Sequence, residues 1–395
     1  MRYDQPTQSV YELVEDNDDQ DRHPDWQRRG QGAGDRFVFP GWDENGDFGA
    51  DFNQNNVDII RPNLNPDWEE PFLRYHVDRP RFLFGVDMNN NGYIDRFEND
   101  DEPDYPYKRD RRRYNVYVGA DLGPFARLSI GRQDERQLAD DRRNETNYLL
   151  LTYERDFATA GRVQVFDNLR RARDDIEDDI FIWRIADGIA GELHERADPL
   201  PARNAWANTF YVRHDFSPAG MNLQSKLKYE FFHQLDDTPS TSAPPIRRTA
   251  SFFGMVNKLA YSVPLAGVTV EPRWKSEFQR LVPSLLDDPL DQPTTELTES
   301  AFLIAHFPLL SRTTIQFGLE YLWTKQFRKS VESTLEGSPR KELVTAVQVA
   351  NQSPYPGYVV FTQFGFRVAR IDIDVLAAPQ TETFIFFTVY AGFGN

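Results

Sequence analysis

Cysteine is absent from this chain of 395 residues. Without thiols the protein can have neither a disulfide framework nor a thiolate metal site. Long apolar runs are missing as well, because no stretch approaches the roughly 18 apolar residues of a membrane-spanning helix. The first residues, MRYDQPTQSV, contain no apolar signal core. Three alternatives stay open: a signal was removed, the chain is an internal fragment, or the protein is cytoplasmic.

Positive charge is in deficit. The chain has 45 Lys and Arg against 62 Asp and Glu, a net charge of −17. A nucleic-acid partner requires a basic face, so we expect none. Aromatic residues make up 14% of the chain, a high share for a sequence without long apolar runs. Aromatic residues in short runs favour strands that are apolar on one face only.

Catalytic motifs are also missing. We find no nucleophile elbow, no HExxH zinc motif and no phosphate loop. An outer-membrane phospholipase combines a barrel with calcium and a Ser–His pair, but no serine here lies in a recognisable motif beside a histidine. We therefore expect no enzymatic activity. The histidines are scattered along the chain: His23, His76, His194, His214, His233 and His306.

Alternating polarity with a period of two runs through residues 114–393. In the segment 315–327, Phe317, Leu319 and Tyr321 share one face, whereas Gln316 and Glu320 share the other. An antiparallel sheet of a soluble sandwich alternates in the same way. However, these segments are about twice as long as the five or six residues of an average globular strand. Aromatic residues near the ends of the apolar faces are typical of membrane barrels.

The connections between the thirteen candidate strands alternate in length. Transmembrane barrels show this parity, with tight periplasmic turns and long external loops. The short connections are 122–125, 156–161, 216–221, 264–267, 308–311 and 353–357, and the long ones are 134–145, 171–203, 236–248, 281–297, 328–340 and 372–380.

The last strand carries a further sign. In TFIFFTVYAGFGN, one apolar face runs unbroken from Ile385 to Phe393. It resembles the C-terminal assembly signal of bacterial outer-membrane proteins, although Gly394 and Asn395 follow the aromatic residue here. With this strand and the loop parity, residues 114–393 resemble bacterial outer-membrane porin-like β-barrels. The acidic stretches VYELVEDNDDQDRHPDW and DRFENDDEPDYPYKRD resemble an uncharacterised barrel family with Asp/Asn-rich surface insertions, for which no activity is known.

The resemblance implies an all-β fold: a transmembrane antiparallel β-barrel in the bacterial outer membrane with a periplasmic C-terminus. We divide the chain into a candidate first barrel strand at 1–14, an acidic segment at 15–113 and the barrel at 114–395. The strand at 7–14 brings the count to about fourteen, the even number that such barrels require. Counting back from the C-terminus places segment 15–113 outside the cell.

Residues 87–98, DMNNNGYIDRFE, match every position of an EF-hand calcium loop, with Gly92 at the sharp turn. The flanking residues have no helical period, so we expect a calcium loop outside an EF-hand domain; the alternative is a solvated turn. Bound calcium would order an acidic segment that has no apolar core of its own. The predicted ligands are Asp87, Asn89, Asn91, Tyr93 through its main-chain oxygen, Asp95 and Glu98, and a looser second set is Asp43, Asn45, Asp47 and Asp51.

The polar strand faces predict a charged lumen and passive diffusion of small hydrophilic solutes through it. We expect Glu320 to be solvated there and to tolerate reversal to arginine. Two alternatives remain: a soluble or surface calcium-dependent adhesion β-sandwich, and a barrel that sheathes a partner such as a cytochrome. Outer-membrane lipid, a second copy of the chain, or a periplasmic or surface protein are the expected partners. The predicted lumen residues are Lys226, Lys228, Glu230, Glu271, Arg273, Lys275, Glu277, Glu320 and Arg367.

Overall fold

The computed structural model describes residues 11–13, 26–28, 36–37, 71–90, 111–177, 180–186, 190–196, 198, 202–235, 248–283, 293–328, 339–374 and 376–393. The helices in these ranges are two single 3₁₀ turns, η1 (Leu73–Tyr75) and η2 (Pro80–Phe82). No described helix is long and apolar enough to cross a membrane.

One antiparallel sheet of 14 strands makes up most of the described residues and confirms the all-β prediction. Its order is β19-β18-β17-β16-β15-β14-β12-β11-β10-β7-β6-β5-β4, with β13 paired to β14. The strands are β4 (Arg111–Asp121), β5 (Ala126–Gln137), β6 (Arg143–Phe157), β7 (Gly161–Asp174), β10 (Ala205–Phe216), β11 (Met221–Gln234), β12 (Thr249–Tyr261), β13 (Val263–Leu265), β14 (Val268–Val282), β15 (Thr294–Leu310), β16 (Thr313–Arg328), β17 (Arg340–Tyr355), β18 (Tyr358–Ile373) and β19 (Gln380–Phe393).

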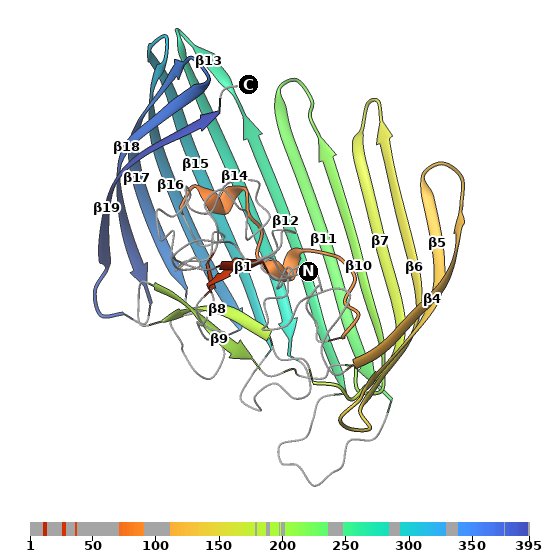
Figure 1. Ribbon diagram of the computed structural model, residues 1–395. Helices are drawn as coiled ribbons and strands as arrows, with labels where there is room; N and C mark the ends of the chain where they lie inside the picture. Colours follow the sequence, from red (N-terminus) through yellow and green to blue (C-terminus); the bar gives the residue numbers. More distant parts are fainter. Residues whose placement is uncertain are drawn as a thin grey trace.

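The sheet curves around a hollow, with successive long strands paired as hairpins (Figure 1). The short turns between paired strands lie at its upper end in that view, and the other ends of these strands lie at the lower end. We call these the turn end and the loop end. β4 and β19 form the two edges of the sheet, and no ladder joins them among the described residues.

The fourteenth strand differs from the prediction. Segment 7–14 was expected to supply it, but β1 (Tyr11–Leu13) pairs with β2 (Trp26–Arg28), which pairs with β3 (Arg36–Phe37). These three strands form a separate sheet, and the short β13 is the fourteenth strand of the large one. A further hairpin, β8 (Ile180–Ala186) and β9 (Ala190–Arg196), lies within the long connection predicted at 171–203.

The two faces of the large sheet differ in burial because successive side chains of a strand point to opposite sides. On β16, Phe317, Leu319 and Tyr321 are 38%, 36% and 46% exposed on the convex face. Glu320 and Leu322, on the concave face, are buried. The concave face is also where charged side chains from several strands are buried: Lys228, Lys258, Lys275, Glu277, Glu296 and Glu342.

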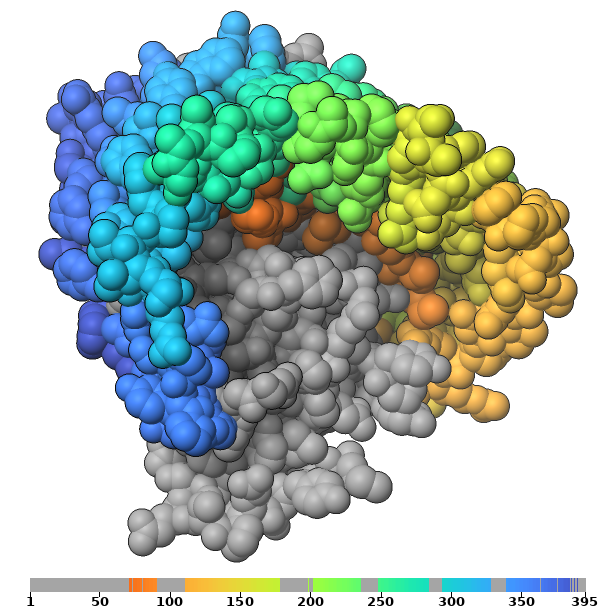
Figure 2. All heavy atoms as spheres, turned by 90° about the horizontal axis from the view of Figure 1, so that it is seen from above, coloured from red at the N-terminus to blue at the C-terminus, as the bar shows by residue number. Residues whose placement is uncertain are grey.

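Residues 71–90, which we call the inner segment, lie against this concave face (Figure 2). In the view from the turn end, their orange atoms lie within the curve of the sheet. Segment 15–113 was predicted to be a surface insertion, but its residues 71–90 contact the concave face of the sheet over much of its width. The physical reason is charge complementarity that only the folded sheet creates.

Candidate functional site

The inner segment has the sequence PFLRYHVDRPRFLFGVDMNN. Pro71 and Pro80 lack the amide donors that a longer helix would need, which is consistent with the single 3₁₀ turns formed here. Along its length the segment presents aromatic rings and charged groups to the wall. Its polar contacts are made by Arg74, Asp78 and Arg79 and by the residues from Asp87 to Asn90.

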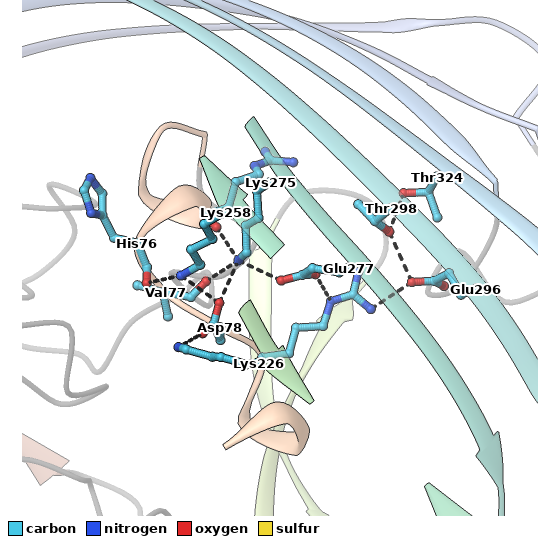
Figure 3. Close-up of polar contacts among 12 residues, drawn as sticks. His76, Val77, Asp78, Lys226, Lys258, Lys275, Glu277, Glu296, Thr298 and Thr324 are labelled. Carbon is cyan, nitrogen blue, oxygen red and sulfur yellow. Dashed lines mark hydrogen bonds and ion pairs between the residues drawn. The ribbon is translucent and has the colours of Figure 1, made fainter. Parts of the chain in front are cut away.

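Asp78 contacts three lysines from three neighbouring strands (Figure 3). Its Oδ1 lies 2.8 Å from Lys258 Nζ and 3.2 Å from Lys275 Nζ, and its Oδ2 accepts a hydrogen bond from Lys226. Burial alone would raise the pKa of Asp78, but the ammonium groups of Lys275, Lys258 and Lys226 outweigh it and hold the pKa below its usual range. The carboxylate is therefore charged at neutral pH.

The lysines also satisfy the main chain of the inner segment. Lys275 Nζ donates to the carbonyl oxygens of Arg74 and Val77, at 2.5 and 2.6 Å. Lys258 Nζ donates to the carbonyl of His76 at 2.8 Å. A backbone that forms no strand ladder needs such donors when it is buried, so these lysines pair with it as well as with Asp78.

Arg74 is the second anchor. Its Nε lies 2.8 Å from Glu320 Oε1, and its Nη1 and Nη2 donate to the two carboxylate oxygens of Glu342 at 3.1 and 2.9 Å. The amide of Phe72 donates to Glu320 Oε2. Glu320 is fully buried. The expectation that Glu320 is solvated is thus wrong. Arginine at this position would meet Arg74 in a buried site, so we now expect the reversal to be unfavourable.

Arg79 is the third anchor and connects neighbouring strands. Its Nη1 lies 2.9 Å from Glu296 Oε1 on β15 and its Nε lies 3.4 Å from Glu277 Oε2 on β14. Glu277 Oε1 is 2.7 Å from Lys275 Nζ. The charged groups therefore alternate in sign from Asp78 through Lys275, Glu277 and Arg79 to Glu296, as Figure 3 shows.

The C-terminal end of the inner segment contacts strands near the β4 edge of the sheet, on the same concave face. Arg170 on β7 donates to the main-chain oxygen of Asp87 and to Asn90 Oδ1, and its Nη2 lies 3.3 Å from Asp87 Oδ2. The Asn90 amide donates to Asp174 Oδ2 at 3.0 Å. The Met88 carbonyl accepts from Gln133 on β5. The segment thus spans the concave face from β17 to β5.

Aromatic rings of the segment rest on glycines of the wall. A Cβ atom at Gly318 would lie 2.6 Å from Phe72 Cε1, and one at Gly254 would lie 2.7 Å from Phe82 Cε1. Phe82 packs edge-on against Phe252, with ring centroids 5.5 Å apart. No larger side chain fits at these two points, so the glycines create the space that the rings occupy.

A polar pocket of about 560 Å³ lies beside the inner segment at the turn end. The charged residues in its wall are Lys258, Arg273, Asp215 and Glu271. Tyr75 and His76 of the inner segment also line it. Arg273 Nη1 donates to His76 Nε2 at 3.0 Å, which requires an unprotonated Nε2. A second pocket, of about 470 Å³, lies beside Phe84 and the β4–β5 turn.

Burial lowers the pKa of His76 to about 4, and the positive charges of Arg273, Lys258 and Lys275 add to this effect, while Glu271 opposes it. Burial also raises the pKa of Tyr75. Both side chains are therefore neutral near pH 7, and they reach the pocket as hydrogen-bonding groups without charge.

The predicted lumen residues lie as follows. Lys226, Lys275, Glu277 and Glu320 contact the inner segment through the pairs described above. Lys228 Nζ donates to the carbonyl of Arg81 at 3.0 Å and lies 2.8 Å from Glu230. Glu271 and Arg273 pair at 2.7 Å in the wall of the larger pocket, and Arg367 is half-buried on β18.

Sequence reasoning missed the inner segment and several partners on the wall. Arg74, Asp78 and Arg79 carry its charge, and Lys258, Glu296, Glu342 and Arg170 were not among the predicted lumen residues. One signal was available: residues 71–84 combine seven aromatic or aliphatic residues with charges of both signs, unlike the Asp/Asn-rich sequence around them.

Only two of the predicted calcium ligands of the loop at 87–98 are described. Asp87 and Asn89 are buried, and the Asp87 carboxylate pairs with Arg170. Asn91, Tyr93, Asp95 and Glu98 lie outside the described residues, as does the second set from Asp43 to Asp51. The described part of the chain contains no cluster of three or more acidic or histidine side chains that could hold a metal ion. Calcium binding stays a prediction.

No family model matches the chain, and no curated protein matches it. Three similar solved structures are of OmpT, an outer membrane protein of Vibrio cholerae. The trimer form is 8% identical, with 71% of this chain and 97% of that chain covered and a TM-score of 0.28. An in-vitro folded form is 9% identical, with 71% and 95% covered and a TM-score of 0.27. A loop L8 deletion mutant is 8% identical, with 71% and 90% covered and a TM-score of 0.27. At such TM-scores the likeness carries no argument.

Proposed function

We propose that this protein is an outer-membrane β-barrel channel that passes small hydrophilic solutes by diffusion through a charged lumen. The observation that carries the proposal is the opposite chemistry of the two faces of one curved sheet. Charged side chains are buried on the concave face, and large apolar side chains are exposed on the convex face. In water such a wide apolar face would promote aggregation, whereas the outer surface of a barrel in lipid has to be apolar.

The convex face supports a membrane location in detail. Its exposed apolar residues follow one another along the strands, for example Leu303, Phe317 and Leu343 on three successive strands. Aromatic residues gather at the turn end, where a membrane barrel meets the lipid headgroups. They are Phe125, Phe157, Phe216, Tyr261, Phe307, Tyr355 and Tyr358.

The soluble sandwich alternative receives less support. A sandwich buries the apolar faces of two sheets against each other. Here the large sheet has its apolar face outward, and the described residues that cover its other face are the mostly polar and aromatic ones of the inner segment. An adhesion module built this way would expose a wide apolar surface to water.

The concave face supports passage of small polar solutes. The larger pocket has both signs of charge in its wall, with Arg273 and Lys258 near Glu271 and Asp215. Such a wall filters solutes by charge without binding one species tightly. By the loop parity, the turn end and the C-terminus are periplasmic and the loop end is extracellular.

Planar-bilayer recording tests this function. The purified protein should require detergent, migrate faster on gels before heating than after it, and produce ohmic channel steps when added to a bilayer. Liposome swelling should then rank small sugars by size. A protein that is monodisperse without detergent and silent in bilayers would contradict the proposal.

We further propose that the loop at 87–98 binds one calcium ion through Asn91, Tyr93, Asp95 and Glu98 together with Asn89 or Asp87. An extracellular site needs only weak affinity, around 10⁻⁴–10⁻³ M. Isothermal titration should detect one ion in this range, and Glu98→Gln should abolish it. Because Arg170 already pairs with Asp87, Arg170→Gln should strengthen the binding if Asp87 is a ligand. Absence of binding at millimolar calcium would make the loop a polar turn.

A further inference from the structure

We infer that the inner segment is a displaceable plug, which rests in the lumen and limits conductance until its ionic anchors are broken. This inference rests on the proposed channel function. It names the element that controls the path, the residues that hold it and the change that releases it.

The position of the segment is the first argument. Its anchors run from Glu342 on β17, through the lysines of β11, β12 and β14, to Arg170 on β7 and Gln133 on β5. A segment anchored to successive strands across the concave face of a curved sheet occupies part of the hollow and narrows it. Solutes must pass through the spaces beside it, which include the two pockets at the turn end.

The kind of contact is the second argument. The strands are held to one another by ladders, but residues 71–90 form no ladder with any described strand. They are held by side-chain pairs and by lysines that donate to carbonyl oxygens. The segment can therefore leave without breaking a strand pair, and the ladders between the strands of the large sheet stay as they were.

The energetics favour reversible holding. Burying an ion pair costs a desolvation penalty that can match the attraction between the charges, so a set of such pairs gives a specific but modest net stability. When the segment leaves, water in the lumen can rehydrate both partners. Removing one partner is different, because it leaves the other charge buried and uncompensated.

Asp78 is the point at which the plug is most sensitive. Three ammonium groups face its carboxylate, from Lys226, Lys258 and Lys275. Lys275 also pairs with Glu277, whereas among the described residues the carboxylate that Lys226 and Lys258 contact is that of Asp78. Replacing Asp78 by asparagine keeps the shape of the side chain but removes its negative charge. The three lysines then repel one another, and in this cluster the backbone carbonyls of the segment are left to hold them.

A thiol-labelling experiment tests the displacement itself. The chain has no cysteine, so Val77→Cys supplies a single buried reporter on the plug. In the folded, liposome-inserted protein this thiol should react slowly with a soluble maleimide. Adding Asp78→Asn should raise the labelling rate by about tenfold or more, equivalent to about 1.4 kcal/mol less stable seating. Asp156→Asn, an exposed acidic residue at a β-turn, is the control and should leave the rate unchanged.

Arg74→Gln provides an independent variant, since it releases Glu320 and Glu342 at another anchor. It should raise the labelling rate in the same direction, and it keeps the test valid if Asp78→Asn fails to fold. Labelling rates that stay at the wild-type value in both variants, with the barrel folded, would overturn the plug.

Conductance then separates this inference from the proposed function. Asp78→Asn should produce larger and more frequent channel openings than the wild type. A wild type that already conducts at the level of Asp78→Asn would overturn the plug but leave the channel intact. Faster labelling with no conductance in any variant would overturn the channel function, and with it the plug's role as a gate.

Discussion

Single residues decide whether the inner segment fits the wall. Gly318 and Gly254 leave room for Phe72 and Phe82, and Glu320 meets both Arg74 and the amide of Phe72. The alternation of each strand assigns the wall residues to one face but does not single them out. Their roles come from what lies opposite them in the folded chain.

Gly318→Leu should unseat the segment without disturbing the strand. The new side chain would occupy the place of the Phe72 ring, and overpacking of this kind costs about 1–3 kcal/mol. Trypsin should therefore cut faster after Arg74 and Arg81, as read by mass spectrometry. Ala301→Leu, on the exposed convex face, is the matched control, and equal cleavage in the two variants would contradict the packing at Gly318.

Acid should loosen the inner segment. The seated segment favours neutral His76, whose pKa is lowered to about 4. The contribution of His76 to the stability of the seated segment is therefore complete above the ordinary histidine pKa and is lost as the pH falls toward the lowered value. The pKa of Asp78 is lowered as well. The contribution of Asp78 to the stability of the seated segment therefore declines only below the ordinary aspartate pKa of about 3.9, which lies below the pH range of the exchange measurement. Hydrogen exchange of residues 71–90, corrected for intrinsic rates, should rise between about pH 7 and about pH 4.5.

His76→Gln is the control for this pH effect. Glutamine keeps a polar side chain beside Arg273 but cannot titrate, so most of the rise in exchange over that window should disappear. Wild-type exchange that does not change with pH would show that His76 does not couple to the seating of the segment.

Strands are the elements that carry the membrane proposal. Their apolar faces follow a period of two over up to 17 residues, and the opposite faces hold the charges. A sheet built this way needs no apolar core between layers. Its stability comes from the ladders and from the medium on each side.

Leu319→Arg should impair assembly. Leu319 is exposed on the convex face near the middle of β16, where arginine in lipid costs about 2–4 kcal/mol. The measurement is the fraction of protein that shows the folded, heat-modifiable band after insertion into liposomes. Thr314→Arg, on the other face of the same strand and close to its turn, should insert normally. Equal insertion of both variants would reject the assignment of the convex face to lipid.

The inner segment is the element that changes how the whole molecule is understood. In the proposed channel, a lumen lined only by charges would be an open pore, whereas a lumen partly filled by residues 71–90 would leave narrower routes beside that segment. The net charge of −17 does not describe these routes, because their walls carry both signs.

At the scale of the whole molecule, ion selectivity should be modest and should depend on the larger pocket. Arg273→Glu turns a positive wall residue negative and should move the bilayer reversal potential toward cation selectivity. Arg203→Glu, the same charge change at an exposed position away from that pocket, should not. An unchanged potential in Arg273→Glu would mean that ions do not pass through the pocket at the turn end.

The sequence by itself determined the strands. Alternation of side chains with a period of two is local information, and so are the turns that follow each strand, such as the one predicted at 353–357, which the structure has at 356–357 between β17 and β18. The thirteen long strands, their antiparallel pairing and the side on which Phe317 and Leu319 lie could therefore be predicted. Which of the polar residues would be buried could not, because alternation separates the two faces and says nothing about what covers one of them.

Tertiary structure alone decided the place of residues 71–90. Asp78 and Lys275 are almost 200 positions apart, and Arg74 and Glu342 are farther still, so no local pattern connects them. The acidic character of the segment around them favoured an exposed loop. The folded sheet, however, gathers lysines from β11, β12 and β14 at one point of its concave face, and a buried group of like charges is stable only with a carboxylate among them. Asp78 supplies that carboxylate, and the segment that carries it lies inside the sheet for this reason.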